Sequence, residues 1–263
     1  MCGIDKMTNF AEPIMNIQNP YGEVEHKVFK RTFLQGTEVG VEFDPPMTSE
    51  DFCTRIVPFV DKTFNVHITD ELDKSTERAE LTSGDGQVKF DFGLNSAKAF
   101  IGKLAYKSFS SSVIQHIATL VNFLKEVACV DTINQTYINK INVWPIESKN
   151  SKLSFSGASF FIFKREHIED IANINFEVSD YPVSAAKEAV VNCGDSASLK
   201  AVIRVELKDE KNASFSLGLR AQALNVNVDD VISDLPKLNE IIFAAFTDIV
   251  SDNIFDLMSK ESL

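Results

Sequence analysis

The residue best suited to covalent chemistry stands at the start of the chain, in Met1-Cys2-Gly3-Ile4. Removal of Met1 would expose Cys2 as an N-terminal nucleophile whose own α-amine could act as its base. A nucleophile of this kind also needs donors that stabilise the developing oxyanion, and the sequence contains no later Asn-Gly stretch to supply them. No GxSxG elbow offers an alternative nucleophile.

The opening tetrapeptide resembles that of glutamine amidotransferases of the N-terminal-nucleophile class. The resemblance ends after four residues, since Asp5-Lys6-Met7 does not continue it. An amidotransferase-like hydrolase acting through Cys2 is therefore the weakest of three functional hypotheses, and no residue is predicted to be catalytic.

Metal and phosphate chemistry lack the necessary spacings. The histidines His26, His67, His116 and His167 stand apart from one another and from the cysteines, without the HxH or HxxxH spacing of metal ligands. The glycines of Ser83-Gly84-Asp85-Gly86 match neither a dinucleotide fingerprint nor a P-loop. The sequence predicts no metal site and no cofactor.

A strand in the middle of the chain mixes amides with large apolar side chains and contains the only tryptophan. Alternation divides it into two faces, one with Tyr137, Asn139, Ile141 and Val143 and the other with Ile138, Lys140, Asn142 and Trp144. In one interpretation Asn139 only ties a loop or bulge to the sheet, because a buried amide needs hydrogen-bond partners. In the other, the strand contributes to a ligand- or partner-binding site formed by Tyr137, Asn139, Asn142 and Trp144.

Tyr137-Ile138-Asn139-Lys140-Ile141 resembles the Tyr-Ile-Asn-x-Ile motif of an uncharacterised, sporadically distributed bacterial family of about this length. The similarity extends to Tyr106-Lys107-Ser108-Phe109 and to the region 226–256. Thr136 stands where the family usually has arginine, which puts any role of that arginine in doubt here. The family has no established activity, and its patchy distribution implies an association with defence or mobile elements.

Composition limits the partners. The formal net charge of −12, without a run of Lys or Arg, excludes non-specific binding to nucleic acid or anionic lipid. No apolar run reaches the length of a membrane span, and the first residues lack a signal-peptide pattern. Because the four cysteines are far apart, we expect reduced thiols in a cytoplasmic protein.

Hydrophobic periodicity predicts both helices and strands. Residues 1–25 form an irregular arm, and a turn at Gln35-Gly36 connects strands 26–34 and 38–43. The remaining expected elements are helices at 48–60, 110–129, 165–174 and 234–258, and extended segments at 66–69, 79–82, 88–94, 97–106, 136–144, 153–164, 187–193, 198–208 and 212–226. For 97–106, where the alternation is poorer, a helix is the alternative.

The predicted fold is α+β, with antiparallel sheets packed on the two long helices 110–129 and 234–258. Residues 26–263 form a single domain with two similar lobes, 26–145 and 146–263. The favoured function is a non-enzymatic binding protein of a bacterial cytoplasm that acts through a protein partner, with self-association as a further option. The alternative is an enzyme or small-ligand sensor with a cleft near Asn139.

Overall fold

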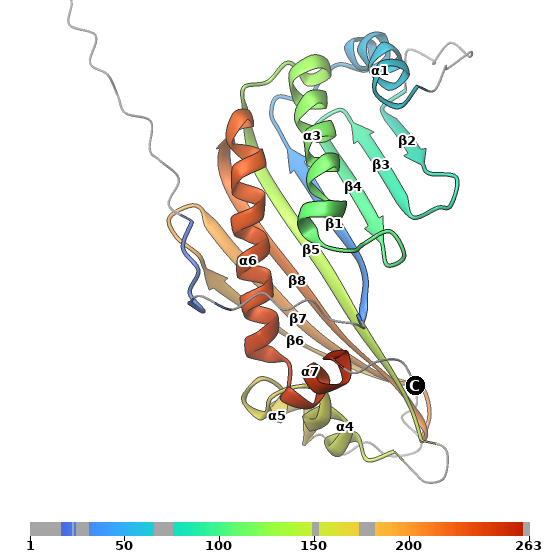
Figure 1. Cartoon of the computed structure of the whole chain (residues 1–263), viewed down its shortest axis with the longest axis vertical. Coiled ribbons are helices and arrows are strands. Elements are labelled where there is room, and N and C mark those ends of the chain that lie inside the picture. Colours follow the sequence, from blue (N-terminus) through green and yellow to red (C-terminus); the bar gives the residue numbers. More distant parts are fainter. Residues whose placement is uncertain are drawn as a thin grey trace, which may run out of the picture.

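The protein is built on one eight-stranded antiparallel sheet, as the prediction of an α+β fold with antiparallel strands requires (Figure 1). The computed structural model describes residues 17–22, 24, 32–65, 76–148, 153–173 and 182–259. Across the sheet the strand order is β2-β3-β4-β1-β5-β8-β7-β6. The strands are β1 (Leu34–Glu42), β2 (Arg78–Thr82), β3 (Val88–Gly93), β4 (Ser96–Gly102), β5 (Thr132–Glu147), β6 (Val183–Asn192), β7 (Ala197–Leu207) and β8 (Asn212–Asn227).

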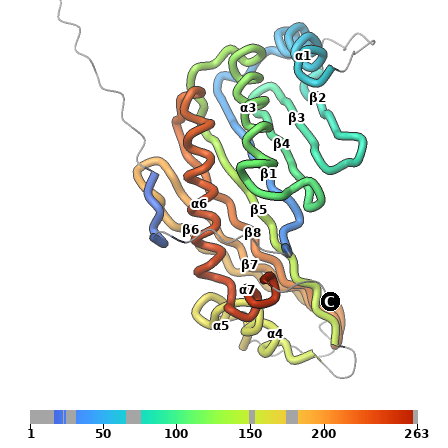
Figure 2. The backbone as a smooth tube through the Cα atoms, viewed as in Figure 1, coloured from blue at the N-terminus to red at the C-terminus, as the bar shows by residue number. Residues whose placement is uncertain are grey.

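The helices gather on one face of this sheet (Figure 2). Three of them pack on its upper and central part: α1 (Ser49–Phe64), α3 (Ile114–Phe123) with a π-helical turn at Leu124–Ala128, and α6 (Val231–Ile249). The short α2 (Phe109–Ser112) precedes α3, and α4 (Phe155–Ile162), α5 (Arg165–Ala172) and α7 (Asp252–Ser259) lie together at one end. The prediction of two long helices is therefore incomplete, because α1, with 16 residues, joins α3 and α6 over the core.

Phenylalanine fills the layer between helices and sheet. The rings of Phe92 and Phe123 stack with centroids 4.8 Å apart, and Phe59 of α1 meets both of them edge-on. Large rings without a polar group can be buried without needing a hydrogen-bond partner. Among the described residues, ten phenylalanine rings are buried, at positions 43, 52, 59, 90, 92, 109, 123, 163, 215 and 246, and the partly buried rings at 33, 64, 155, 160 and 255 pack against them.

The order of elements repeats. A strand, a helical segment, three strands and a helix occur first as β1 to α3 and again as β5 to α6, and the sheet order is symmetric about the β1–β5 pair. The two similar lobes are not confirmed, because β5 pairs with both β1 and β8 within one continuous sheet. The boundary expected near residue 145 falls inside β5.

The predicted turn at Gln35-Gly36 is wrong, because both residues lie inside the continuous strand β1. Glycine is required at position 36 because of packing instead. A Cβ built on Gly36 would lie 2.4 Å from Cζ of Phe100, whose ring crosses the strand at this point. The first predicted strand, 26–34, lies mostly outside the described residues, as does the segment 66–69.

Two predictions near the helices also need correction. Most of the segment 153–164 is helical rather than extended, since it forms α4, which Ser154 caps by accepting a hydrogen bond of 3.2 Å from the Gly157 amide. The last helix begins at Val231 rather than after Asp234, and it ends at Ile249, where Val250 pairs with Phe163 before α7 starts. Asp234 is buried inside α6 and accepts a bond from Lys237.

The predicted N-terminal arm is described only in part. Ile17 pairs with Gly194, and the Asn19 side chain donates to the Gly22 carbonyl across a turn. Cys2 lies outside the described residues. None of the helices in the described part of the chain is long and apolar enough to cross a membrane.

Candidate functional site

The structure divides the four predicted site residues between the two faces of β5. Tyr137 and Asn139 lie on the open face, which no described helix covers, whereas Asn142 and Trp144 lie beneath the helices. Trp144 is 2% exposed and packs between Phe33 and Phe163. The strand therefore does not bring the four side chains to a single site.

Tyr137 is held flat against the neighbouring strand β1. Its ring lies over Gly40, where a Cβ would come within 2.4 Å of the ring atom Cζ, so only glycine leaves room for it. The Arg220 guanidinium covers the opposite side of the ring at 3.8 Å from the centroid, a cation–π contact. The hydroxyl donates to Glu38 at 3.1 Å, and burial, together with the nearby Glu38 charge, raises the pKa of Tyr137 well above its usual range.

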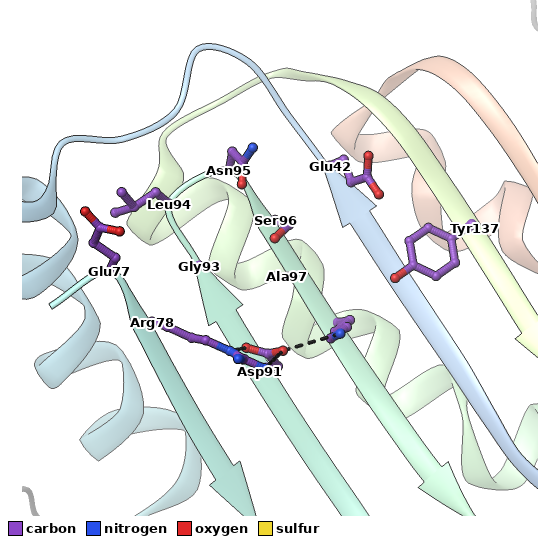
Figure 3. A pocket seen from close by; sticks show the side chains of 11 residues that line it. Glu42, Glu77, Arg78, Asp91, Gly93, Leu94, Asn95, Ser96, Ala97 and Tyr137 are labelled. Carbon is purple, nitrogen blue, oxygen red and sulfur yellow. Dashed lines mark hydrogen bonds and ion pairs between the residues drawn. The ribbon is translucent and has the colours of Figure 1, made fainter.

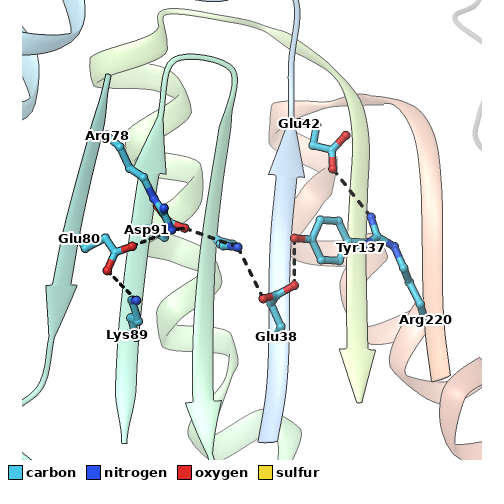
Figure 4. A network of polar contacts seen from close by, with 9 residues as sticks. Glu38, Glu42, Arg78, Glu80, Lys89, Asp91, Tyr137 and Arg220 are labelled. Atoms are coloured by element: carbon cyan, nitrogen blue, oxygen red, sulfur yellow. Dashed lines mark hydrogen bonds and ion pairs between the residues drawn. The ribbon is translucent and has the colours of Figure 1, made fainter. Parts of the chain in front are cut away.

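A row of charged side chains continues from Tyr137 across the open face (Figure 4). Arg78 binds both carboxylate oxygens of Asp91 at 2.6 Å, a bidentate pair. Lys98 lies between Asp91, at 3.5 Å, and Glu38, at 3.9 Å. Although burial alone would raise it, the hydrogen bond and charge of Arg78, with help from Lys98, hold the pKa of Asp91 below its usual value.

An open depression of about 510 Å³ lies beside this row, at the end of the sheet where β3 turns into β4 (Figure 3). Arg78, Asp91 and Lys98 line it together with Tyr137, and two further carboxylates, Glu42 and Glu77, border it. These groups offer charge and hydrogen bonds. The lining residues include no cysteine or histidine, and Lys98, the one lysine among them, contacts Asp91 and Glu38 rather than a hydroxyl group.

Sequence reasoning missed this row, although a signal was present. Lys89 and Asp91 alternate with phenylalanines, and Glu38 and Glu42 alternate with valines, which identifies an outward polar face on each strand. Which cations and carboxylates meet depends on the strand order, because Asp91 is opposite Lys98 and Gly40 separates Lys98 from Tyr137.

Among the ionisable groups on the covered face of the sheet, Lys140 has the pKa that lies furthest from its usual value. Its Nζ donates to Tyr106 Oη at 3.0 Å and to Asn239 Oδ1 at 2.7 Å, and it lies 5.1 Å from the centre of the Tyr106 ring. No carboxylate of the described residues lies within ion-pair distance of it. Burial lowers the pKa of Lys140 to about 7 and raises that of Tyr106 to about 12.

The two histidines that the structure describes, which are the remaining candidates for catalysis or metal binding, do not come together in one site. His116 packs edge-on against Phe90, and burial lowers its pKa, while His167 contacts Asp248 at 3.1 Å. His26 and His67 lie outside the described residues. Among the residues that the structure describes, no three His, Cys, Asp or Glu side chains are close enough to hold a metal ion.

Comparison with known proteins does not assign this chain to a family. No family model matches the sequence, and no curated protein is similar to it. Among solved structures, the TBP of Methanococcus jannaschii aligns with 79% of this chain and 96% of its own, at 9% identity and a TM-score of 0.24. Similarity at this level supports neither a fold assignment nor a function.

Replacing Trp144 by phenylalanine tests whether this residue binds anything. The indole Nε1 is buried and has no hydrogen-bond partner among the described residues, so the smaller ring loses packing but no polar contact. We expect the unfolding free energy in urea to fall by about 1 kcal/mol, with partner binding unchanged. A variant of wild-type stability that had lost binding would instead place Trp144 in a binding site.

Proposed function

We propose that the protein is a non-enzymatic binding protein of a bacterial cytoplasm, and that a protein partner docks on the open face of the sheet around Tyr137. The observation that carries the proposal is the combination of side chains on this face. Phe100, Ile141 and Leu224 remain exposed there, around ion-paired groups. Apolar anchors within a polar surround are typical of protein interfaces.

Ile141 is the best anchor among them. It is 44% exposed, and its neighbours across the sheet are Gly36 on β1 and Gly218 on β8, so its side chain stands between two positions without side chains of their own. An apolar group that projects in this way can enter a pocket of a partner and lose its contact with water. Such central anchors carry most of the binding free energy of an interface.

The charges of the face favour a protein over a nucleic acid. Arg78, Lys98 and Arg220 each have a carboxylate within 4.0 Å, as do Lys89 and Lys200. Cations that are already paired cannot neutralise phosphates without breaking those pairs. The carboxylate of Glu77, which borders the depression, would suit a basic side chain of the partner.

A small-ligand sensor is the second candidate, and the depression beside Tyr137 favours it, since convergent polar groups in a concavity can orient a metabolite. The depression lies on the same face of the sheet as Asn139, although Asn139 is not among the residues that line it. A ligand that raises the melting temperature of the wild type, but not that of a Ser96→Arg variant whose long side chain occupies the depression, would establish this role.

The proposed docking face can be tested with two exposed isoleucines. Ile141 is 44% exposed on the open face, and Ile232, on α6, is 43% exposed on the helical side. In affinity capture from the organism that encodes the protein, we expect the wild type and Ile232→Arg to recover the same protein. We expect Ile141→Arg to recover at least tenfold less, because about 1.4 kcal/mol corresponds to a factor of ten.

Two results would contradict the proposal. Equal recovery by both variants would show that the open face is not the docking surface. Equal loss by both would show that the capture responds to added positive charge at any exposed position. Circular dichroism of each variant provides the control for folding.

A further inference from the structure

The two edges of the sheet are protected to different degrees. β2, at one edge, has five residues, and its outward side chains Arg78 and Glu80 are tied into ion pairs. β6, at the other edge, has ten residues, no proline, and exposed small or apolar side chains at Ser184, Ala186 and Val190. Short, charged edge strands resist pairing with another chain, whereas long and flat ones invite it.

The outer edge of β6 is free within the described residues. The strand pairs with β7 along its whole length and is last in the sheet order. The bridge between Ile17 and Gly194 lies beyond its C-terminal end. A contact with α5 runs through the ion pair between Lys187 and Asp170, on the covered face. The backbone donors and acceptors of the outer edge therefore have no described partner.

The covered face of β6 is a palindrome. Every second residue, opposite core residues of β7, belongs to the series Val183, Ala185, Lys187, Ala189 and Val191. The series reads the same in both directions from Lys187. If a second copy of the strand ran antiparallel with a two-fold axis at Lys187, valine would meet valine and alanine would meet alanine.

We propose that β6 pairs antiparallel with β6 of a second copy of this chain, with the two-fold axis at Lys187, to form a dimer with one continuous sixteen-stranded sheet. An axis perpendicular to the sheet pairs residues of the same parity, so the helices of both copies stay on one side and the open faces on the other. On the open face Ser184 of one copy lies opposite Val190 of the other.

The charges near the axis are compatible with this register. The two Lys187 ammonium groups would be neighbours, and each is bound to Asp170 of its own chain at 2.7 Å. Glu188, on the other face, is bound to Lys200 at 2.8 Å. These charges are thus neutralised within their own copy, and the ladder would add about ten backbone hydrogen bonds.

Disulfide trapping tests the register. In a background with serine at positions 2, 53 and 129, Lys187→Cys places two thiols directly opposite each other, with Cα atoms about 5 Å apart, a separation that a disulfide spans. Ala189→Cys is the matched control on the same edge, because its two copies are about 13 Å apart along the strands. We expect mild oxidation to crosslink the first variant and not the second. Crosslinking of both to the same extent, or of neither, would overturn the register.

A charge exchange tests the dimer without disturbing the fold. Val190 is 68% exposed and Ser184 is exposed as well, so neither contributes to the core. The variants Ser184→Asp/Val190→Asp and Ser184→Lys/Val190→Lys place like charges opposite each other across the interface. In sedimentation we expect a dimer for the wild type, at least tenfold weaker dimerisation for each variant, and restored dimers in a mixture of the two. A wild type that sediments as a monomer, or variants that dimerise as well as it does, would refute the proposal.

Discussion

The variant Lys140→Met is expected to lose a pH dependence of stability that the wild type shows between pH 7 and 9.5. Burial lowers the pKa of Lys140 in the folded protein to about 7, against about 10.5 in the unfolded chain. Within this interval the unfolded chain binds a proton that the folded protein does not. The unfolding free energy of the wild type should therefore rise with pH, by about 2 to 3 kcal/mol over the interval.

The direction of the effect follows from the sign of the pKa shift. Below pH 7 both states are protonated and the full penalty of burying an ammonium without a carboxylate is present. The penalty disappears as the pH passes the folded pKa and approaches the unfolded one. Methionine has no proton to lose, so its curve should lack this rise. Burial also raises the pKa of Tyr106, to about 12 against 10.0 in the unfolded chain, so that its ionisation at high pH would change the stability as well. The measurement therefore stays below pH 9.5, where tyrosine ionisation contributes little.

Urea denaturation at several pH values, followed by the fluorescence of the single tryptophan, measures this difference. Lys103→Met is the matched control, since Lys103 is exposed and has no ion pair among the described residues. Its unfolding free energy should follow the wild-type pH dependence. If the curves of the wild type and Lys140→Met were parallel, the ammonium of Lys140 would have to be better solvated than its contacts imply.

The sequence predicted best the elements that local pattern determines. In β7 alanine, isoleucine, valine and leucine alternate with charged residues, and the strand was predicted to within one residue at each end. The strands predicted at 79–82 and 88–94 were also found, and the turn between them is formed locally: Gly86 adopts φ 70° and the Asp85 carboxylate accepts hydrogen bonds from Ser83 and Gln87. In both places neighbouring residues in the sequence contain all the necessary information.

Elements that depend on distant contacts were predicted less well. Gly36 indicates a turn by local rules, yet its function is to let the Phe100 ring cross β1, and Phe100 is 64 positions away. The end of α6 depends on the pairing of Val250 with Phe163. The hydrophobic periodicity of either segment gives no information about its distant partner, Phe100 for Gly36 and Phe163 for Val250.

The same limit applies to the candidate site. Alternation correctly separated Tyr137 and Asn139 from Asn142 and Trp144, but it could not say which face the helices would cover. Lys140 went unnoticed as a special residue because its partners, Tyr106 and Asn239, are 34 and 99 positions away. The signal in the sequence was a lysine whose neighbours on the same strand face, at positions 138 and 142, are an isoleucine and an amide.

Gly40→Ala is expected to lower the unfolding free energy by about 2 kcal/mol, as overpacking does in a well-packed site. The added Cβ would lie 2.4 to 2.6 Å from atoms of the Tyr137 ring. The ring has little freedom to move away, because Arg220 covers it and Glu38 holds its hydroxyl. In a Tyr137→Ala background the clash is gone, and Gly40→Ala should become neutral or slightly stabilising, since alanine has less conformational freedom to lose on folding.

The double-mutant cycle should therefore give a coupling of about 2 kcal/mol between positions 40 and 137. Gly218→Ala is the matched control on the same face of the same sheet, because the nearest atom to its Cβ would be the Val202 carbonyl oxygen at 3.9 Å. We expect that change to alter the unfolding free energy by less than about 0.5 kcal/mol. A cost at position 218 equal to that at position 40 would mean that any side chain there weakens the strand. Only a cost confined to position 40, and removed with the ring, shows that Tyr137 is fixed in place before a partner arrives.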